Sequence, residues 1–115
     1  LHNVVSSEGV LIFDVCTETN SLKYFRNMTD RDEGEGFSYV RHSFYEDEIQ
    51  YNRFDIRFDK PQEDVTETHR QRIYALQEVQ TTIEASPFRI EGSYDGFTLS
   101  TPTDRSDRVH FVLRP

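Results

Sequence analysis

The stretch THRQRIYALQEV, Thr68–Val79, changes its periodicity halfway along. Its first half alternates polar and basic residues, as an exposed β-strand does. From Leu76 onward the apolar residues Leu76, Val79 and Ile83 fall on one stripe of a helix. Ser86-Pro87 then ends the helical pattern, because proline cannot continue a helix. The stretch therefore predicts a strand that runs into a helix, with a histidine and two arginines at the junction.

Upstream of this junction, three segments predict an antiparallel meander with one covered face. They are Phe37–Tyr45, Ile49–Asp59 and Val65–Tyr74, and the second alternates cleanly between apolar and charged residues. A charged loop is expected at Asp30–Gly36. That loop is not a calcium site, because Arg41 stands where the bidentate glutamate would be needed.

Strands and short helices flank the meander on both sides. The apolar run Val10–Val15 predicts a strand buried on both faces, as in a parallel sheet. A short helix is expected over residues 20–27. Phe88–Phe97 predicts a strand with a glycine break, and Arg108–Leu113 predicts a closing strand. The order of these elements is neither that of a simple sandwich nor that of a full βαβ array.

Composition limits the class of partner. The 115 residues carry a formal net charge of −8, which disfavours nucleic-acid phosphates and anionic membranes as partners. The single cysteine, Cys16, excludes an internal disulfide and fits a reducing, cytoplasmic compartment. No apolar run has the length of a transmembrane helix. The four histidines lack metal-site spacing, so we expect no metal.

Two segments together resemble a known family. EGVLIFDVCTE, Glu8–Glu18, and the long segment from His69 to Leu113 are similar to the C-terminal half of a class I S-adenosylmethionine-dependent methyltransferase, of the small-molecule type with a β insertion. The resemblance covers essentially residues 1–115, with the inserted lid at about 37–74. It implies an α/β fold, in which Gly9–Asp14 is strand five of a Rossmann-like, seven-stranded sheet.

The same resemblance assigns the remaining elements. His69–Ile83 would lead from the inserted sheet into the last helix, with Ala75 where the family has a capping Ser or Thr. Phe88–Gly96 and Arg108–Leu113 would be strands six and seven, joined by the loop Pro102–Arg108. Strand seven is expected to lie between strands five and six.

The cofactor that the resemblance implies is S-adenosylmethionine, bound mainly by an N-terminal half that this chain does not contain. Gly34-Glu35-Gly36 follows a charged loop and does not form the family's glycine-rich turn after a strand. This chain alone is therefore expected to be inactive. Without that half, strand five would expose an unpaired edge, so we expect either a homo-oligomer or pairing with the N-terminal half.

Candidate substrate-binding residues come from the lid and from the end of strand five. No catalytic or cofactor-binding residue can be assigned. Arg53, Asp55 and Arg57 are interpreted as cross-strand ion pairs, and alternation sets His69 on the opposite face from Arg70 and Arg72. The candidates are Asp14, Cys16, Arg41, His42, Tyr45, His69 and Arg72.

The expected function is methyl transfer to a small molecule. Methyl transfer from a sulfonium is a displacement, which needs an oriented nucleophile in a closed site. A different class of function also fits the meander and the 13% aromatic content: a free-standing β-rich binding or assembly module without catalysis. A third interpretation is an inactive fragment retained for assembly.

Overall fold

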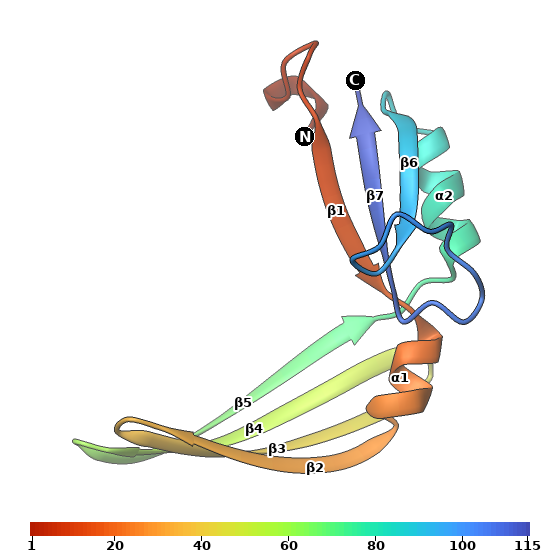
Figure 1. Ribbon diagram of the computed structural model, residues 1–115. Helices are drawn as coiled ribbons and strands as arrows, with labels where there is room; N and C mark the ends of the chain where they lie inside the picture. Colours follow the sequence, from red (N-terminus) through yellow and green to blue (C-terminus); the bar gives the residue numbers. More distant parts are fainter. The chain divides into compact units, whose positions relative to one another are not determined.

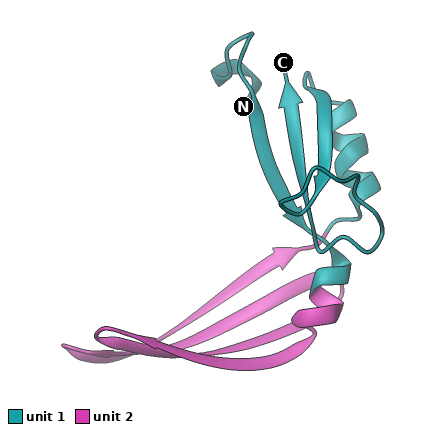
Figure 2. Cartoon of the chain, viewed as in Figure 1, with its two compact units in different colours: residues 1–20, 74–115 teal, residues 21–73 magenta.

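The computed structural model describes residues 1–115, which form two compact units. One unit comprises Leu1–Asn20 and Tyr74–Pro115, and the other comprises Ser21–Ile73 (Figure 2). The elements, shown in Figure 1, are a 3-10 helix at His2–Val4, β1 Leu11–Cys16, α1 Glu18–Tyr24, β2 Asn27–Gly34, β3 Phe37–Glu46, β4 Ile49–Asp59, β5 Gln62–Arg72, α2 Leu76–Glu84, β6 Arg89–Asp95 and β7 Arg108–Arg114.

The first unit is built on a three-stranded sheet of order β1-β7-β6. Strand β7 is antiparallel to both neighbours, and its register with β1 pairs Phe13 with Phe111. A bulge between Ile90 and Gly92 interrupts the pairing of β6, at the glycine break expected from the sequence. The predicted position of strand seven between strands five and six is therefore confirmed.

One face of this sheet holds the core. Val109, Phe111 and Leu113 of β7 are almost fully buried, as their alternation predicts, and Ile83 of α2 joins them. Helix α2 runs alongside β6 (Figure 1). The partly buried residues that complete the cluster are Leu11, Phe13, Val15, Leu76, Val79, Phe88 and Ile90.

Helix α2 begins without a side-chain cap. Ala75 occupies the N-cap position, and its methyl group accepts no hydrogen bond. The Glu78 carboxylate instead accepts a hydrogen bond from the Ala75 backbone N–H at 3.1 Å. Half of a capping box is thus retained, which compensates in part for the missing Ser or Thr.

The prediction that Val10–Val15 is buried on both faces is wrong for this chain. Side chains along β1 alternate between partly buried and exposed, and Ile12 is 62% exposed. Strand β1 has a sheet neighbour on one side only, and that neighbour is antiparallel. The face of β1 that carries Ile12 and the free edge of the strand therefore lie open.

The second unit is a four-stranded sheet of order β2-β3-β4-β5, in which each strand pairs antiparallel with its sequence neighbour. The loop predicted at Asp30–Gly36 is instead mostly strand β2, because Thr29 and Asp30 pair with His42 and Arg41 of β3. Only Glu35-Gly36 turns, with Gly36 at φ 82°. The helix expected at residues 20–27 lies slightly earlier, at Glu18–Tyr24.

The expected covered face of the meander is covered only in part within the chain. All residues of β5 are exposed except Val65, which is half-buried. The well-buried residues of the strands are polar, namely Ser43 and Gln50, and Ile73 is buried just beyond β5. The period-2 pattern predicted the strands correctly, but it could not reveal whether a partner lies on either face.

Candidate functional site

Asp14 and Cys16, two of the predicted site residues, meet a residue that the sequence did not single out. Arg108 lies opposite Cys16 in the β1–β7 register. Its Nη1 donates a hydrogen bond to Asp14 Oδ2, and its Nη2 lies 3.1 Å from Cys16 Sγ. The cluster lies at the carboxyl end of β1, where open α/β sheets place ligands. Arg108 therefore fixes both candidates at this end of the sheet.

His110 extends this cluster and was also missed. It pairs with Asp14 in the register and packs against the Phe97 ring at 4.9 Å between centroids. Its Nδ1 atom is buried and has no hydrogen-bond partner. The closing strand contained the signal: if Val109, Phe111 and Leu113 face the core, the alternate residues of β7 must face the other side, beside Asp14.

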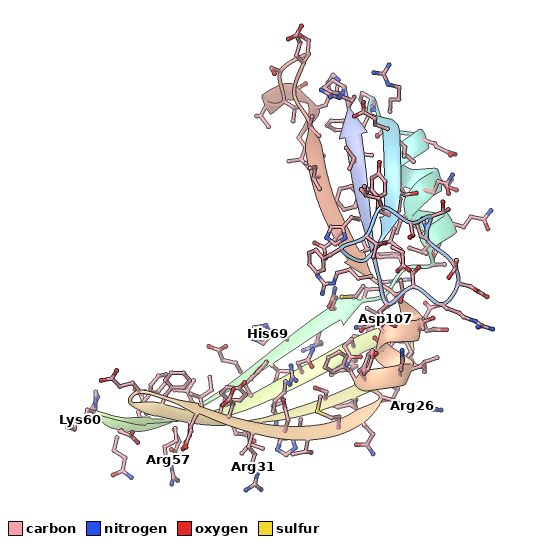
Figure 3. All side chains as sticks on the ribbon, viewed as in Figure 1. Arg26, Arg31, Arg57, Lys60, His69 and Asp107 are labelled. Carbon is pink, nitrogen blue, oxygen red and sulfur yellow. The ribbon has the colours of Figure 1, made fainter.

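The five lid candidates divide between the two faces of the second sheet. By register and alternation, Arg41, Tyr45 and His69 lie on one face, whereas His42 and Arg72 lie on the other. Figure 3 shows His69 on the side of the sheet opposite Arg31 and Arg57. The predicted separation of His69 from Arg70 and Arg72 is confirmed.

Arg41 is held by two partners. Its Nε and Nη2 donate to the two carboxylate oxygens of Asp30 at 2.9 and 2.8 Å. Its guanidinium also lies over the Phe25 ring, 5.3 Å from the centroid. A bidentate, stacked arginine is well ordered. Arg41 therefore presents a fixed cation to its face of the sheet.

His69 and His42 both neighbour carboxylates. His69 Nε2 lies 3.2 Å from Glu67 Oε2, and its ring meets Phe54 edge to face at 5.5 Å. On the opposite face, His42 Nε2 lies 3.5 Å from Asp55 Oδ2, and Nδ1 lies 3.2 Å from Thr29 Oγ1. Each histidine has partners on its own or the adjacent strands, which is what a structural histidine also has.

The cross-strand ion pair predicted for Arg57 is confirmed, whereas the one predicted for Arg53 is wrong. Arg57 pairs with Asp64 across strands at 3.0 Å, whereas Arg53 pairs with Asp55 along one strand at 3.3 Å. The Asp64 hydrogen bond and negative charge raise the pKa of Arg57 above its ordinary value, so its charge is constant at physiological pH. Arg72 Nη2 lies 3.7 Å from Glu48 Oε2.

An open hollow of about 840 Å³ lies on the second sheet, far along the strands from Tyr45. Its volume is within the range of small-molecule sites, but it contains none of the seven candidates. Residues from all four strands line it: Arg31, Asp32, Glu33, Ser38, Tyr39, Val40, Asp55, Ile56, Arg57, Asp64, Val65 and Thr66.

The glycines of this chain do not fit an S-adenosylmethionine loop. Such a loop connects a strand to a helix, so that backbone N–H groups and the helix N-terminus face the cofactor. Gly34 and Gly36 instead lie at the hairpin between β2 and β3, and Gly96 lies in the turn after β6. No group of three or more His, Cys, Asp or Glu residues is placed to hold a metal ion. Neither helix has the length and apolar character needed to cross a membrane.

Three proteins that resemble this chain in sequence or in fold are named methyltransferases. The chain is 28% identical over 123 residues to "Putative methyltransferase YqeM" of Bacillus subtilis (strain 168), a match that covers 94% of this chain and 45% of the relative. No model of a known protein family matches the chain.

Two solved structures share its fold. An S-adenosylmethionine-dependent methyltransferase from Clostridium acetobutylicum ATCC 824 superposes with a TM-score of 0.76 at 16% identity, over 97% of this chain and 46% of that one. The CcbJ methyltransferase from Streptomyces caelestis superposes with a TM-score of 0.68 at 9% identity, over 97% and 45%. The chain thus spans a little under half the length of these relatives, and its α/β fold is that expected for the C-terminal part of such a domain.

Proposed function

Because the chain resembles class I S-adenosylmethionine-dependent methyltransferases in sequence and in fold, we propose that it is the C-terminal part of such an enzyme. In this proposal the whole enzyme transfers a methyl group from S-adenosylmethionine to a small molecule. This chain supplies β1, β7, β6 and α2 to the catalytic domain, and its second sheet acts as the substrate lid.

One observation carries the proposal: two structural neighbours are methyltransferases, and this chain matches 97% of its own length to under half of each. The sequence match to the Bacillus protein covers a similar share, 45%. Both comparisons therefore relate the chain to part of a longer protein. The strand order β1-β7-β6 agrees with the end of a seven-stranded methyltransferase sheet.

The residues of this chain would contribute orientation to the reaction. Methyl transfer needs the acceptor atom in line with the methyl carbon, which a closed and shaped site provides. Arg108 holds Asp14 and Cys16 at the carboxyl end of β1, and the lid offers Arg41, fixed by Asp30. The net charge of −8 argues for a small-molecule acceptor over a nucleic acid.

The free edge of β1 supplies a place for the rest of the enzyme. Strand β1 is paired with β7 only, and Ile12 is exposed beside that edge. An edge of this kind pairs readily with another strand. We expect the N-terminal half to occupy it, and a chain expressed without that half to associate with itself instead.

Calorimetric titration with S-adenosylmethionine tests the proposal. The complete natural polypeptide that contains this chain should bind the cofactor, whereas the 115-residue chain alone should release no heat. The same titration with adenosine serves as a control for non-specific binding. A complete polypeptide that binds no S-adenosylmethionine would overturn the proposal and favour a β-rich binding module.

A further inference from the structure

The two faces of the lid sheet differ in charge and in aromatic content. One face, here called the acidic face, carries one arginine and four carboxylates on its strands: Arg41, Asp30, Asp32, Glu63 and Glu67. The opposite face carries five arginines against five carboxylates: Arg31, Arg53, Arg57, Arg70 and Arg72 against Glu33, Glu46, Asp55, Asp59 and Asp64. The excess of negative charge in this sheet therefore lies on the acidic face.

The acidic face also carries a continuous apolar strip. Phe37 lies opposite Phe58 in the register, and Tyr39 lies opposite Ile56, which lies opposite Val65. Phe54 follows on β4 and meets the Tyr39 ring at 5.6 Å between centroids, with the planes at 63°. Apart from Val65, these residues belong to the two inner strands of the sheet. The strip therefore runs along the middle of this face.

Carboxylates border the strip on both sides. Asp30 and Asp32 lie on the outer strand β2, and Glu63 and Glu67 lie on the outer strand β5. Asp30 is neutralised by Arg41, while Glu67 has only the neighbouring His69. An apolar strip between two acidic borders is complementary to a molecule with an apolar body and a positive charge.

The apolar strip is incompletely covered by the chain itself. Phe37 and Phe58 are each 38% exposed, and no residue of β5 is buried. Exposed aromatic groups gathered on one sheet face are typical of a binding surface. A second copy of the chain would bring acidic borders against acidic borders, so the charge argues against self-association through this face.

We propose that the acidic face of the lid binds a small molecule with an aromatic or aliphatic body and a protonated amine. The inference rests on the proposed function, because it names the class of substrate that the lid would admit. The rings of Phe54 and Tyr39 contact the apolar body, and they attract the cation through their π faces. The carboxylates of β2 and β5 favour the charged form over neutral analogues.

A pair of isosteric probes tests this inference on the complete natural polypeptide. Phenethylamine is protonated at pH 7, whereas 2-phenylethanol has the same shape without the charge. Nuclear magnetic resonance titration at constant ionic strength should give about tenfold tighter binding of the amine. Equal affinity for the two probes, or no binding of either, would overturn the proposal.

Matched variants locate the binding to one face. Phe54→Leu, which keeps an apolar side chain but removes the ring, should weaken phenethylamine binding at least fivefold. Phe44→Leu is its control, because Phe44 stacks on Tyr51 on the opposite face. The double variant Glu63→Gln/Glu67→Gln should reduce the preference for the amine below threefold, whereas Glu33→Gln/Asp59→Asn should leave it intact. Equal effects of the two pairs would contradict the assignment.

Cofactor binding, measured in parallel, keeps the two proposals separate. Amine binding without S-adenosylmethionine binding would refute the methyltransferase proposal and leave the amine site standing as part of a binding module. Cofactor binding without a preference for the amine would refute the amine site and leave the methyltransferase proposal standing. A melting curve by circular dichroism for each variant excludes loss of binding through unfolding.

Discussion

The two sheets of this protein use similar residues in different ways. The sheet of the first unit buries Val109, Phe111 and Leu113 against α2, and Val109 is only 1% exposed. The sheet of the second unit has longer strands, yet its aromatic residues stay half-buried or exposed. The difference shows that a regular β-ladder is no evidence for a core. The stability of the first unit comes from packing, and that of the second from cross-strand pairs.

Truncating one phenylalanine in each sheet tests this difference in packing. Phe111→Ala should lower the free energy of unfolding of the first unit by about 3–5 kcal/mol, because it leaves a cavity beside Phe13. Phe58→Ala, at a 38% exposed position, should cost less than about 1 kcal/mol. Urea denaturation, monitored by the nuclear magnetic resonance signals of backbone amides in each unit, measures both changes in the free energy of unfolding. Similar losses would show that the second sheet has a core after all.

A buried hydroxyl gives a smaller contrast. Thr17 Oγ1 donates to the Ser106 carbonyl at 2.6 Å and accepts from the Asn20 N–H, where Thr17 is almost fully buried. Thr17→Val should therefore cost about 1–3 kcal/mol, because two polar partners lose their hydrogen bond. Thr66→Val removes an exposed bond to Asp55 in the other sheet and should change stability little. Thermal melting of both variants compares them, and an unaffected Thr17→Val variant would contradict the expectation.

The turn between β2 and β3 should respond to backbone strain alone. Gly36 has φ 82°, and a Cβ there would meet no atom within 4 Å. Gly36→Ala should thus cost about 1 kcal/mol through the left-handed conformation, without any clash. Glu35→Ala in the same turn is the control and should be close to neutral. A neutral Gly36→Ala variant would indicate that the turn changes its conformation freely.

The smallest effect is expected for the exposed ion pair of Arg57 and Asp64. Arg57→Gln should leave the melting temperature unchanged within error, since solvent screens an exposed pair. The raised pKa of Arg57 means that its part in the pair persists at every pH below the ordinary arginine value and is lost only in strong alkali. Arg57 should therefore contribute nothing to any difference between the melting curves of the wild-type chain at pH 7 and pH 9. A clear loss of stability in Arg57→Gln at pH 7 would show that the pair is less exposed than its geometry indicates.

Periodicity predicted the elements where the pattern was strong. Strand β4 agrees residue by residue with the alternating run Ile49–Asp59, and α2 ends at Glu84, just before the Ser86-Pro87 stop. The charged segment Asp30–Gly36 was misassigned because its composition resembles a loop. Its strand is held by pairing with β3, an interaction that lies outside any local window.

The candidate site was predicted in part. Asp14 and Cys16 were selected from their place at the end of a strand, and the structure joins them through Arg108. Arg108 and His110 were missed although strand seven was expected beside strand five, because the sequence did not predict the register that sets them opposite Cys16 and Asp14. For the second sheet, alternation separated His69 from Arg70 and Arg72. It could not predict that the charges of the whole sheet would be unequal between its faces.

The register of β1 also has a consequence for the order of folding. Each strand of the second sheet pairs with the strand that precedes it in the sequence, so its contacts are local and can form as soon as the chain emerges from the ribosome. Leu11 pairs with Leu113, and it must wait until nearly all of this segment has been synthesised. During that interval the edge of β1 that pairs with β7 stays unpaired. The time spent in this state leaves that edge of β1 open to pairing with other chains.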